Sequence, residues 1–106
     1  MAHDAGHPDL GPFLHLRRYV TIAHHVPGRI RLKLGLEAVS RLPKVDPAPF
    51  TQLFDRIRGI KLTRINKAAL SVVVEYDSHI IAPSVWPRLL EGDLAEIEEI
   101  LSAHAA

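Results

Sequence analysis

The chain has 106 residues, of which 47% are hydrophobic and 24% are charged, a composition typical of one folded globular domain. It contains no cysteine, which excludes disulfides, iron–sulfur clusters, thiolate metal sites and a cysteine nucleophile. No apolar run reaches the roughly 20 residues of a membrane-spanning helix, and the first residues do not have the pattern of a signal peptide. We therefore expect a cytoplasmic protein without a transmembrane segment.

The formal net charge of +1 hides an uneven distribution of charge. Twelve of the thirteen Lys and Arg residues lie between Arg17 and Lys67, whereas seven of the twelve acidic residues follow Ala68. If the fold separates these segments, the surface is bipolar and could pair with a charged partner or with another copy of the chain. Alternatively, a basic sheet face and acidic helices neutralise each other within the molecule.

The N-terminal segment has no hydrophobic period. Residues 1–16 contain two glycines, two prolines and three histidines. Such a composition favours an irregular chain. We therefore expect a flexible N-terminal tail over residues 1–16 and a single domain over residues 17–106.

Two β-forming segments flank a Pro-Gly pair. Residues 19–26 are rich in β-branched residues, and Pro27-Gly28 favours a type II turn. Because a type II turn twists poorly for a tight hairpin, we expect a bent strand or a wide turn here. The residues that follow alternate strictly, which predicts a half-buried strand with a cationic outer face. Its apolar side has Ile30, Leu32 and Leu34, and its cationic side has Arg29, Arg31 and Lys33.

A helix is predicted after this strand. Asp46 can cap the first free N–H groups, and Pro47 is tolerated at the first helical position. Gly59 is the expected left-handed stop. The apolar stripe of this helix has the spacing i, i+3, i+4 and i+7 and consists of Phe50, Leu53, Phe54 and Ile57.

The remaining elements complete an α+β pattern. Residues 60–65 and 70–76 predict two strands, and their four-residue connection predicts an antiparallel hairpin. Ser84 and Asp93 are helix-capping candidates on either side of a break at Gly92. The order strand, helix, strand, strand, helix predicts a two-layer sandwich, in which the helices pack on one face of an antiparallel sheet.

Three motifs resemble a known family. IAHHVPGRIRLKL at 22–34, RIRGIKLTRIN at 56–66 and SVVVEYD at 71–77 are similar to the divergent heavy-metal-associated domains found at the amino ends of some metal-transporting P-type ATPases and as stand-alone proteins. This resemblance covers about half the chain. It implies a ferredoxin-like βαββαβ fold and a place in metal handling or in the regulation of metal transport.

The chain departs from this family in ways that bear on function. The usual Cys-x-x-Cys metal site is absent, and the hairpin turn has Ala68-Ala69 where the family often has Thr-Gly or Gly-Ser. No clear fourth strand follows the last helix. Residues 19–26 could fill that edge, either in their own chain or in a neighbour's. Since an open sheet edge invites pairing, we expect a homo-oligomer.

His24 and His25 are the strongest metal candidates. Imidazole is a common ligand for transition metals and for haem iron. Adjacent residues on an extended strand point to opposite faces, so both bind one ion only if the turn distorts the strand. The alternative is that one imidazole packs or hydrogen-bonds while the other is solvated.

The basic residues Arg29, Arg31 and Lys33, together with Arg64, form a candidate binding stripe. It could bind phosphate, nucleic acid, an acidic peptide or anionic lipid, or it could be a solvated face that resists aggregation. The scarcity of exposed aromatic residues argues against nucleic acid. No phosphate loop, zinc-protease motif or nucleophile elbow is present, so we do not expect an enzyme.

These patterns lead to one leading expectation and two alternatives. The first is a non-enzymatic accessory domain in metal homeostasis. It would bind a transition metal or haem through His24 or His25, or dock to a metal-transporting P-type ATPase through Arg29 and Arg31. The second is a protein interaction module, such as a homodimer, without metal. The third is an anion or nucleic-acid binder that uses the basic strand face.

Overall fold

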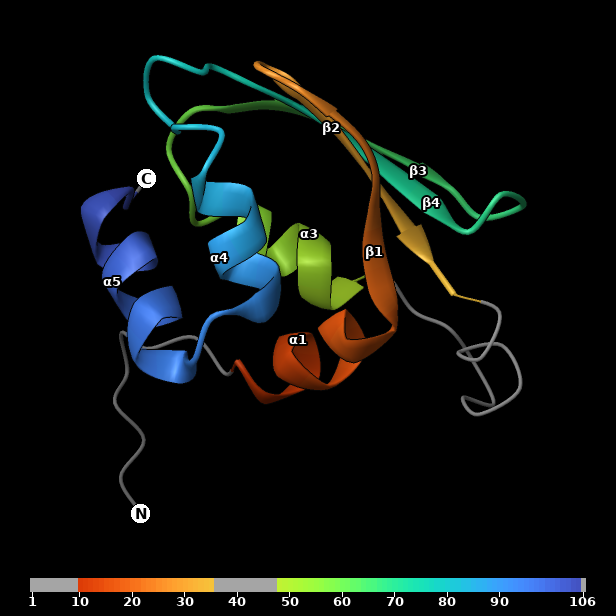
Figure 1. Ribbon diagram of the computed structural model, residues 1–106, viewed down its shortest axis with the longest axis horizontal. Helices are drawn as coiled ribbons and strands as arrows, with labels where there is room; N and C mark the ends of the chain where they lie inside the picture. The colour runs from red at the N-terminus through yellow and green to blue at the C-terminus, as the bar shows by residue number, and fades with distance from the viewer. Residues whose placement is uncertain (1–9, 36–47, 106) are drawn as a thin grey trace.

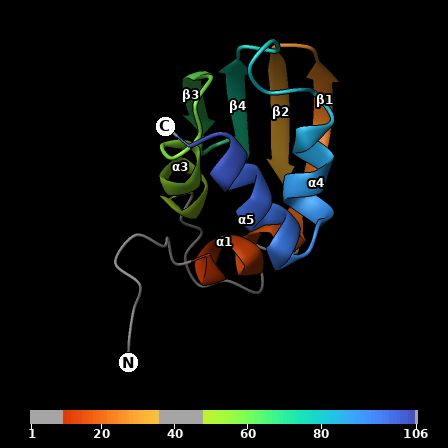
Figure 2. The same cartoon turned by 90° about the vertical axis from the view of Figure 1, so that its left-hand side faces the viewer.

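The computed structural model describes residues 10–35 and 48–105. Four strands form one antiparallel sheet in the order β1-β2-β4-β3, and the helices lie together on one face of it (Figure 1 and Figure 2). The α+β class and the antiparallel sheet expected from the sequence are therefore confirmed. The strands are β1 (Val20–Val26), β2 (Arg29–Leu34), β3 (Ile60–Asn66) and β4 (Ser71–Tyr76).

The helical layer is made of short elements, whose ends follow local chemistry. Asp93 caps α5 as predicted, because its carboxylate accepts a hydrogen bond from the N–H of Glu96 at 2.9 Å. Ser84 precedes α4, but its side chain makes no capping bond, so that expectation is wrong. The elements are α1 (Gly11–Leu16), the 3₁₀ turn η1 (Arg17–Tyr19), α3 (Ala48–Phe54), α4 (Val85–Glu91) and α5 (Leu94–Ala103).

The core lies between the two layers. From the sheet it takes the inward side chains of β2 and β4, with Ile30 and Val74 both fully shielded from solvent. From the helices it takes Trp86, whose ring centroid lies 5.1 Å from that of Tyr76 and 5.7 Å from that of Phe54. The apolar stripe predicted for the helix is buried at all four positions, of which Phe50, Leu53 and Phe54 belong to α3 and Ile57 lies beyond its end.

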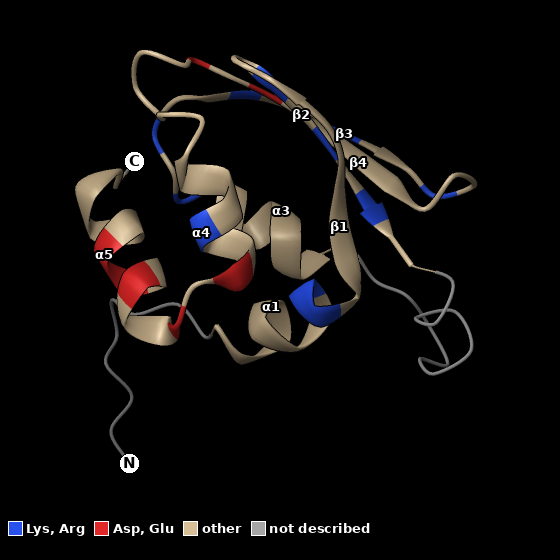
Figure 3. Cartoon of the chain, viewed as in Figure 1, with Lys and Arg blue, Asp and Glu red and all other residues tan. Residues whose placement is uncertain are grey.

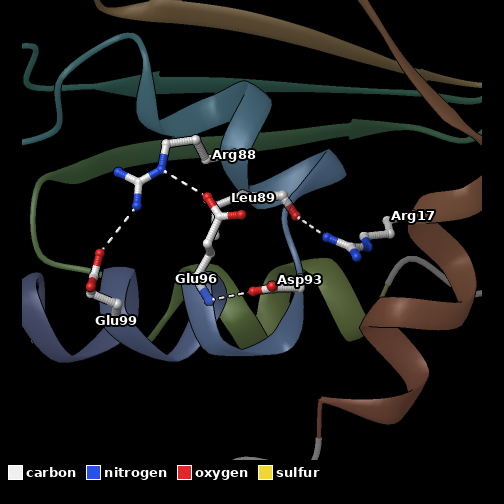
Figure 4. A network of polar contacts seen from close by, with 6 residues as sticks. All are labelled: Arg17, Arg88, Leu89, Asp93, Glu96 and Glu99. Atoms are coloured by element: carbon white, nitrogen blue, oxygen red, sulfur yellow. Dashed lines mark hydrogen bonds and ion pairs between the residues drawn. The ribbon is translucent and has the colours of Figure 1, made fainter.

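The predicted N-terminal tail over residues 1–16 is wrong for its last part. Residues Gly11–Leu16 form α1, whose Phe13 is buried and meets the Phe50 ring at a centroid distance of 5.1 Å. Arg17 then donates a hydrogen bond to the Leu89 carbonyl at 2.8 Å, which fastens η1 to α4 (Figure 4). A six-residue helix has too few turns to show a hydrophobic period, so only its tertiary partners reveal it. Residues 1–9 lie outside the described residues.

The Pro27-Gly28 pair closes a tight hairpin, so the expected bent strand or wide turn is wrong. Val26 pairs directly with Arg29, and only Pro27 and Gly28 remain in the loop. Gly28 has a φ of +92°, which suits the second central position of a type II turn. Its carbonyl accepts the N–H of Tyr76 at 2.9 Å. This bond joins the turn to the end of β4.

The order of elements along the chain differs from the βαββαβ order that the family resemblance implies. Here β1 and β2 come first, and β1 forms a sheet edge beside β2 within its own chain. After α5 the described chain makes only an isolated bridge, between Ala105 and Ile57.

Gly59 provides a test of the backbone between α3 and β3. It has the predicted positive φ, of 101°, although α3 already ends at Phe54, and Asp46 and Pro47 lie outside the described residues. A Cβ at Gly59 would lie 2.9 Å from Cγ2 of Ile80. We expect Gly59→Ala to lower the free energy of unfolding by at least about 1–2 kcal/mol, the cost of a left-handed L-residue, as measured by urea denaturation.

Gly35→Ala is the matched control. A Cβ there would meet only the Tyr19 carbonyl, at an ordinary 3.5 Å, and the φ of Gly35 is not positive. Its stability should change by less than about 1 kcal/mol in either direction. Equal effects of the two substitutions would contradict the backbone argument for Gly59.

Candidate functional site

The sheet face turned away from the helices is the candidate site, and we call it the outer face. The register aligns its side chains in rows that cross the sheet from β1 through β2 and β4 to β3. Cross-strand neighbours in such rows lie about 5 Å apart. The central row is His24, Arg31, Val73 and Arg64; the row toward the Pro27-Gly28 turn is Val26, Arg29, Glu75 and Leu62; the third row is Thr21, Lys33, Ser71 and Asn66.

The structure brings together all four cations that the sequence predicted for this face. Arg31 and Arg64 both neighbour Val73, one from each side of β4. Their backbones are therefore about 10 Å apart, two strand spacings, and their long side chains can reach one common group over Val73. The four cations are Arg29, Arg31, Lys33 and Arg64, and all are exposed.

Opposing charge is scarce on the outer face. Glu75 is its one carboxylate, and this residue is half-buried in the row of Arg29. Among residues 10–35 and 48–105, no acidic side chain forms an ion pair with any of the four cations. Within the described ranges, the charges of Arg31, Lys33 and Arg64 are thus available to an external group.

Aliphatic side chains lie among these cations. Val26 is 44% exposed and Leu62 is 41% exposed, and Val73 is half-buried between Arg31 and Arg64. The amino-acid sequence does not reveal these three residues as neighbours of the cations, because alternation within a single strand does not show which residues of other strands stand beside it. Apolar groups next to arginine are common at protein interfaces.

Acidic residues gather in the helical layer (Figure 3). Arg88 of α4 is the cation that meets them, with its Nε 3.3 Å from Glu96 and its Nη2 3.2 Å from Glu99 (Figure 4). Glu91 and Glu98 are exposed nearby in the chain. The acidic side chains of α5 therefore lie on the other side of the sheet from the four cations of the outer face. Further arginines lie in η1 and just after α3, so the described charges match neither the bipolar surface nor the internal neutralisation in full.

The two candidate metal ligands lie on opposite faces. His24 pairs with Arg31 and belongs to the outer face, whereas His25 pairs with Ile30 and turns toward the helices. The His25 Nε2 lies 2.7 Å from the Tyr76 hydroxyl. Burial, and then the nearby His24, lowers the pKa of His25 below its usual value. This is the arrangement of the non-metal alternative, in which one imidazole hydrogen-bonds and the other is solvated.

Among the described residues, neither imidazole belongs to a larger set of possible metal ligands. Across the part of the chain that the structure describes, there is no group of three His, Cys, Asp or Glu side chains that could hold a metal ion. The Tyr76 partner of His25 was missed in the sequence because the two residues are 51 positions apart.

Comparison with known proteins leaves the family open. No protein-family model matches the chain, and no curated protein or solved structure is significantly similar to it. The resemblance to heavy-metal-associated domains therefore stays a prediction from three sequence motifs. Within the described residues, none of the helices has the length and apolar character needed to cross a membrane.

The lowered pKa of His25 predicts acid sensitivity. A His whose pKa is below 6.5 in the folded state binds its proton more tightly when the chain unfolds, so stability falls as the pH drops through 6.5. We expect the free energy of unfolding to decrease between about pH 7.5 and about pH 5.5, and to decrease less in His25→Gln. Urea denaturation at both pH values measures this difference.

His24→Gln is the control for this prediction. It leaves the burial of His25, the larger cause, in place and removes the smaller cause. An NMR titration should therefore give His25 a pKa below 6.5 in the wild type and a slightly higher one in His24→Gln. A wild-type value at or above 6.5 would contradict the assigned environment.

Proposed function

We propose that this chain is a non-enzymatic docking module whose outer face binds an acidic, partly apolar surface of a partner protein. The observation that carries the proposal is the central row, in which Arg31 and Arg64 flank Val73 without an acidic partner of their own among the described residues. Exposed arginines next to aliphatic groups suit the binding of a protein carboxylate. The guanidinium group binds a carboxylate in a bidentate manner, while the methylene stem of the arginine packs on apolar surface.

A protein partner fits the outer face better than nucleic acid does. Binding to single strands usually relies on aromatic side chains on which bases stack, and no residue of the three rows is Phe, Tyr or Trp. The exposed Val26 and Leu62 offer no stacking surface, but they can bury against apolar side chains of a protein.

We also propose that the sheet is a variant of the ferredoxin-like sheet. The segment from β2 through α3, β3 and β4 to α4 follows the order strand, helix, strand, strand, helix. In this interpretation β1 takes the edge position beside β2 that the family's final strand would occupy. A metal-transporting P-type ATPase is then a candidate partner, because this chain resembles the heavy-metal-associated domains of such transporters. His24 and His25 are given no joint metal role, because they lie on opposite faces.

Charge reversal tests the docking proposal. We expect the double variant Arg31→Glu/Arg64→Glu to bind a synthetic peptide of alternating Glu and Leu about tenfold more weakly than the wild type, since each exposed charge pair contributes roughly 0.2–1 kcal/mol and reversal replaces attraction with repulsion. Isothermal titration calorimetry at two salt concentrations measures the affinity. The wild-type affinity should fall as salt screens the charges.

The matched control is Arg18→Glu, because Arg18 is exposed on η1 and lies outside the outer face. This variant should retain wild-type affinity for the peptide. Equal weakening by Arg18→Glu, or a tighter complex with a DNA duplex than with the peptide at the same salt concentration, would refute a protein-docking function for the outer face.

A further inference from the structure

A separate cavity lies at the end of the sheet away from the Pro27-Gly28 turn. It has a volume of about 150 Å³, comparable with an apolar cavity of about 150 Å³ that holds a benzene ring. Its walls come from both layers, which distinguishes it from the outer face. The apolar lining includes Leu16 of α1, Val20 of β1, Leu34 of β2, Phe50 of α3, Ile65 of β3 and Val72 of β4.

The cavity is accessible from outside the core. Ile65 pairs with Val72, on the side of the sheet that the helices cover elsewhere, yet Ile65 remains 38% exposed. Val20, Leu34 and Val72 are only partly buried. Apolar surface that faces inward and remains open to solvent gains free energy when an apolar group covers it.

One residue of the cavity wall, Leu70, has an unfavourable backbone conformation. Leu70, in the turn between β3 and β4, has a φ of +54° and is part of the lining. The left-handed region disfavours leucine, whereas glycine or asparagine adopts it readily. The Leu70 carbonyl accepts the N–H of Leu34 at 2.8 Å, which holds the conformation in place. Strained residues of this kind cluster at functional sites, and here the strain is associated with an apolar side chain in the cavity wall.

The polar part of the lining has one sign of charge. It consists of Lys33, Asn66, Lys67 and Ser71, and no carboxylate is among the lining residues that the structure describes. A ligand that fills this cavity with an apolar group can therefore place a negative charge beside lysine at low cost. A carboxylate on the ligand would complement this lining.

We propose that the cavity binds an amphipathic carboxylate, whose apolar ring or short chain occupies the space beside Leu70 and Ile65 and whose carboxylate is held by Lys67. The proposal for this site does not rest on the docking function proposed for the outer face, although the two sites are neighbours. A ligand that fits this cavity combines one apolar group, about the size of a benzene ring, with one negatively charged group.

The first test compares three probes with the full chain by NMR chemical-shift titration. The probe 4-phenylbutyrate should bind and shift the amide signals of cavity residues. Its uncharged amide should bind about fivefold more weakly, and butyrate, which lacks the ring, should not bind. In Lys67→Glu the preference for the acid over the amide should disappear. Absence of shifts with 4-phenylbutyrate, or equal affinities of acid and amide in the wild type, would overturn the proposal.

The second test separates a binding role of Leu70 from a structural one. Asparagine tolerates the left-handed backbone, so Leu70→Asn should fold with equal or greater stability and yet bind 4-phenylbutyrate about tenfold more weakly, because an apolar wall is lost. Leu62→Asn, on the outer face, is the matched control and should bind as the wild type does. If Leu70→Asn loses stability and keeps its affinity, Leu70 serves the fold and the proposed site is wrong.

Discussion

The alternation of side chains along β2 is the constraint on which the rest of the structure depends. Ile30 and Leu32 are 0% and 3% exposed and form the centre of the core, while Arg29, Arg31 and Lys33 point outward. A shift of one residue would exchange the two sets and bury three unpaired cations, at a prohibitive cost. The Pro27-Gly28 turn and its bond to Tyr76 of β4 fix this register on two sides. The core and the outer face are therefore two consequences of one alignment.

The positions of the charged side chains follow from how this alignment is combined with the chain order. Four cations lie on strands whose outer side is not covered by any of the described helices, and the acids of α5 lie on the opposite side, where η1 and the segment after α3 also bring arginines (Figure 3). Arg88 neutralises part of the acidic charge locally, through Glu96 and Glu99. The sheet separates the remaining charges, so neither set screens the other well, and each can act on a partner.

Most features set by local chemistry were predictable from the sequence, although the tight Pro27-Gly28 turn and the absence of a Ser84 capping bond were not. Features set by distant contacts were not predictable. The alternation of β2, the Asp93 cap and the hairpin of β3 and β4 each depend on neighbouring residues, and the structure confirms them. The fold of α1 depends on Phe50, far along the chain. In the candidate site, the four cations were predicted, whereas their aliphatic neighbours and the Tyr76 partner of His25 required the sheet register. The opposite orientation of His24 and His25 was also predictable, since adjacent residues on an extended strand face opposite ways.

The two proposed sites meet at one end of β2 and β4. Lys33, Ser71 and Asn66 belong both to the third row of the outer face and to the lining of the cavity. A carboxylate in the cavity would therefore reduce the positive potential at that end of the face, because charges separated by less than a Debye length still interact. If both proposals hold, the two ligands oppose each other, and linkage requires each to weaken the binding of the other by the same factor. The central row, which is one row farther from the cavity, would retain most of its attraction for an acidic partner.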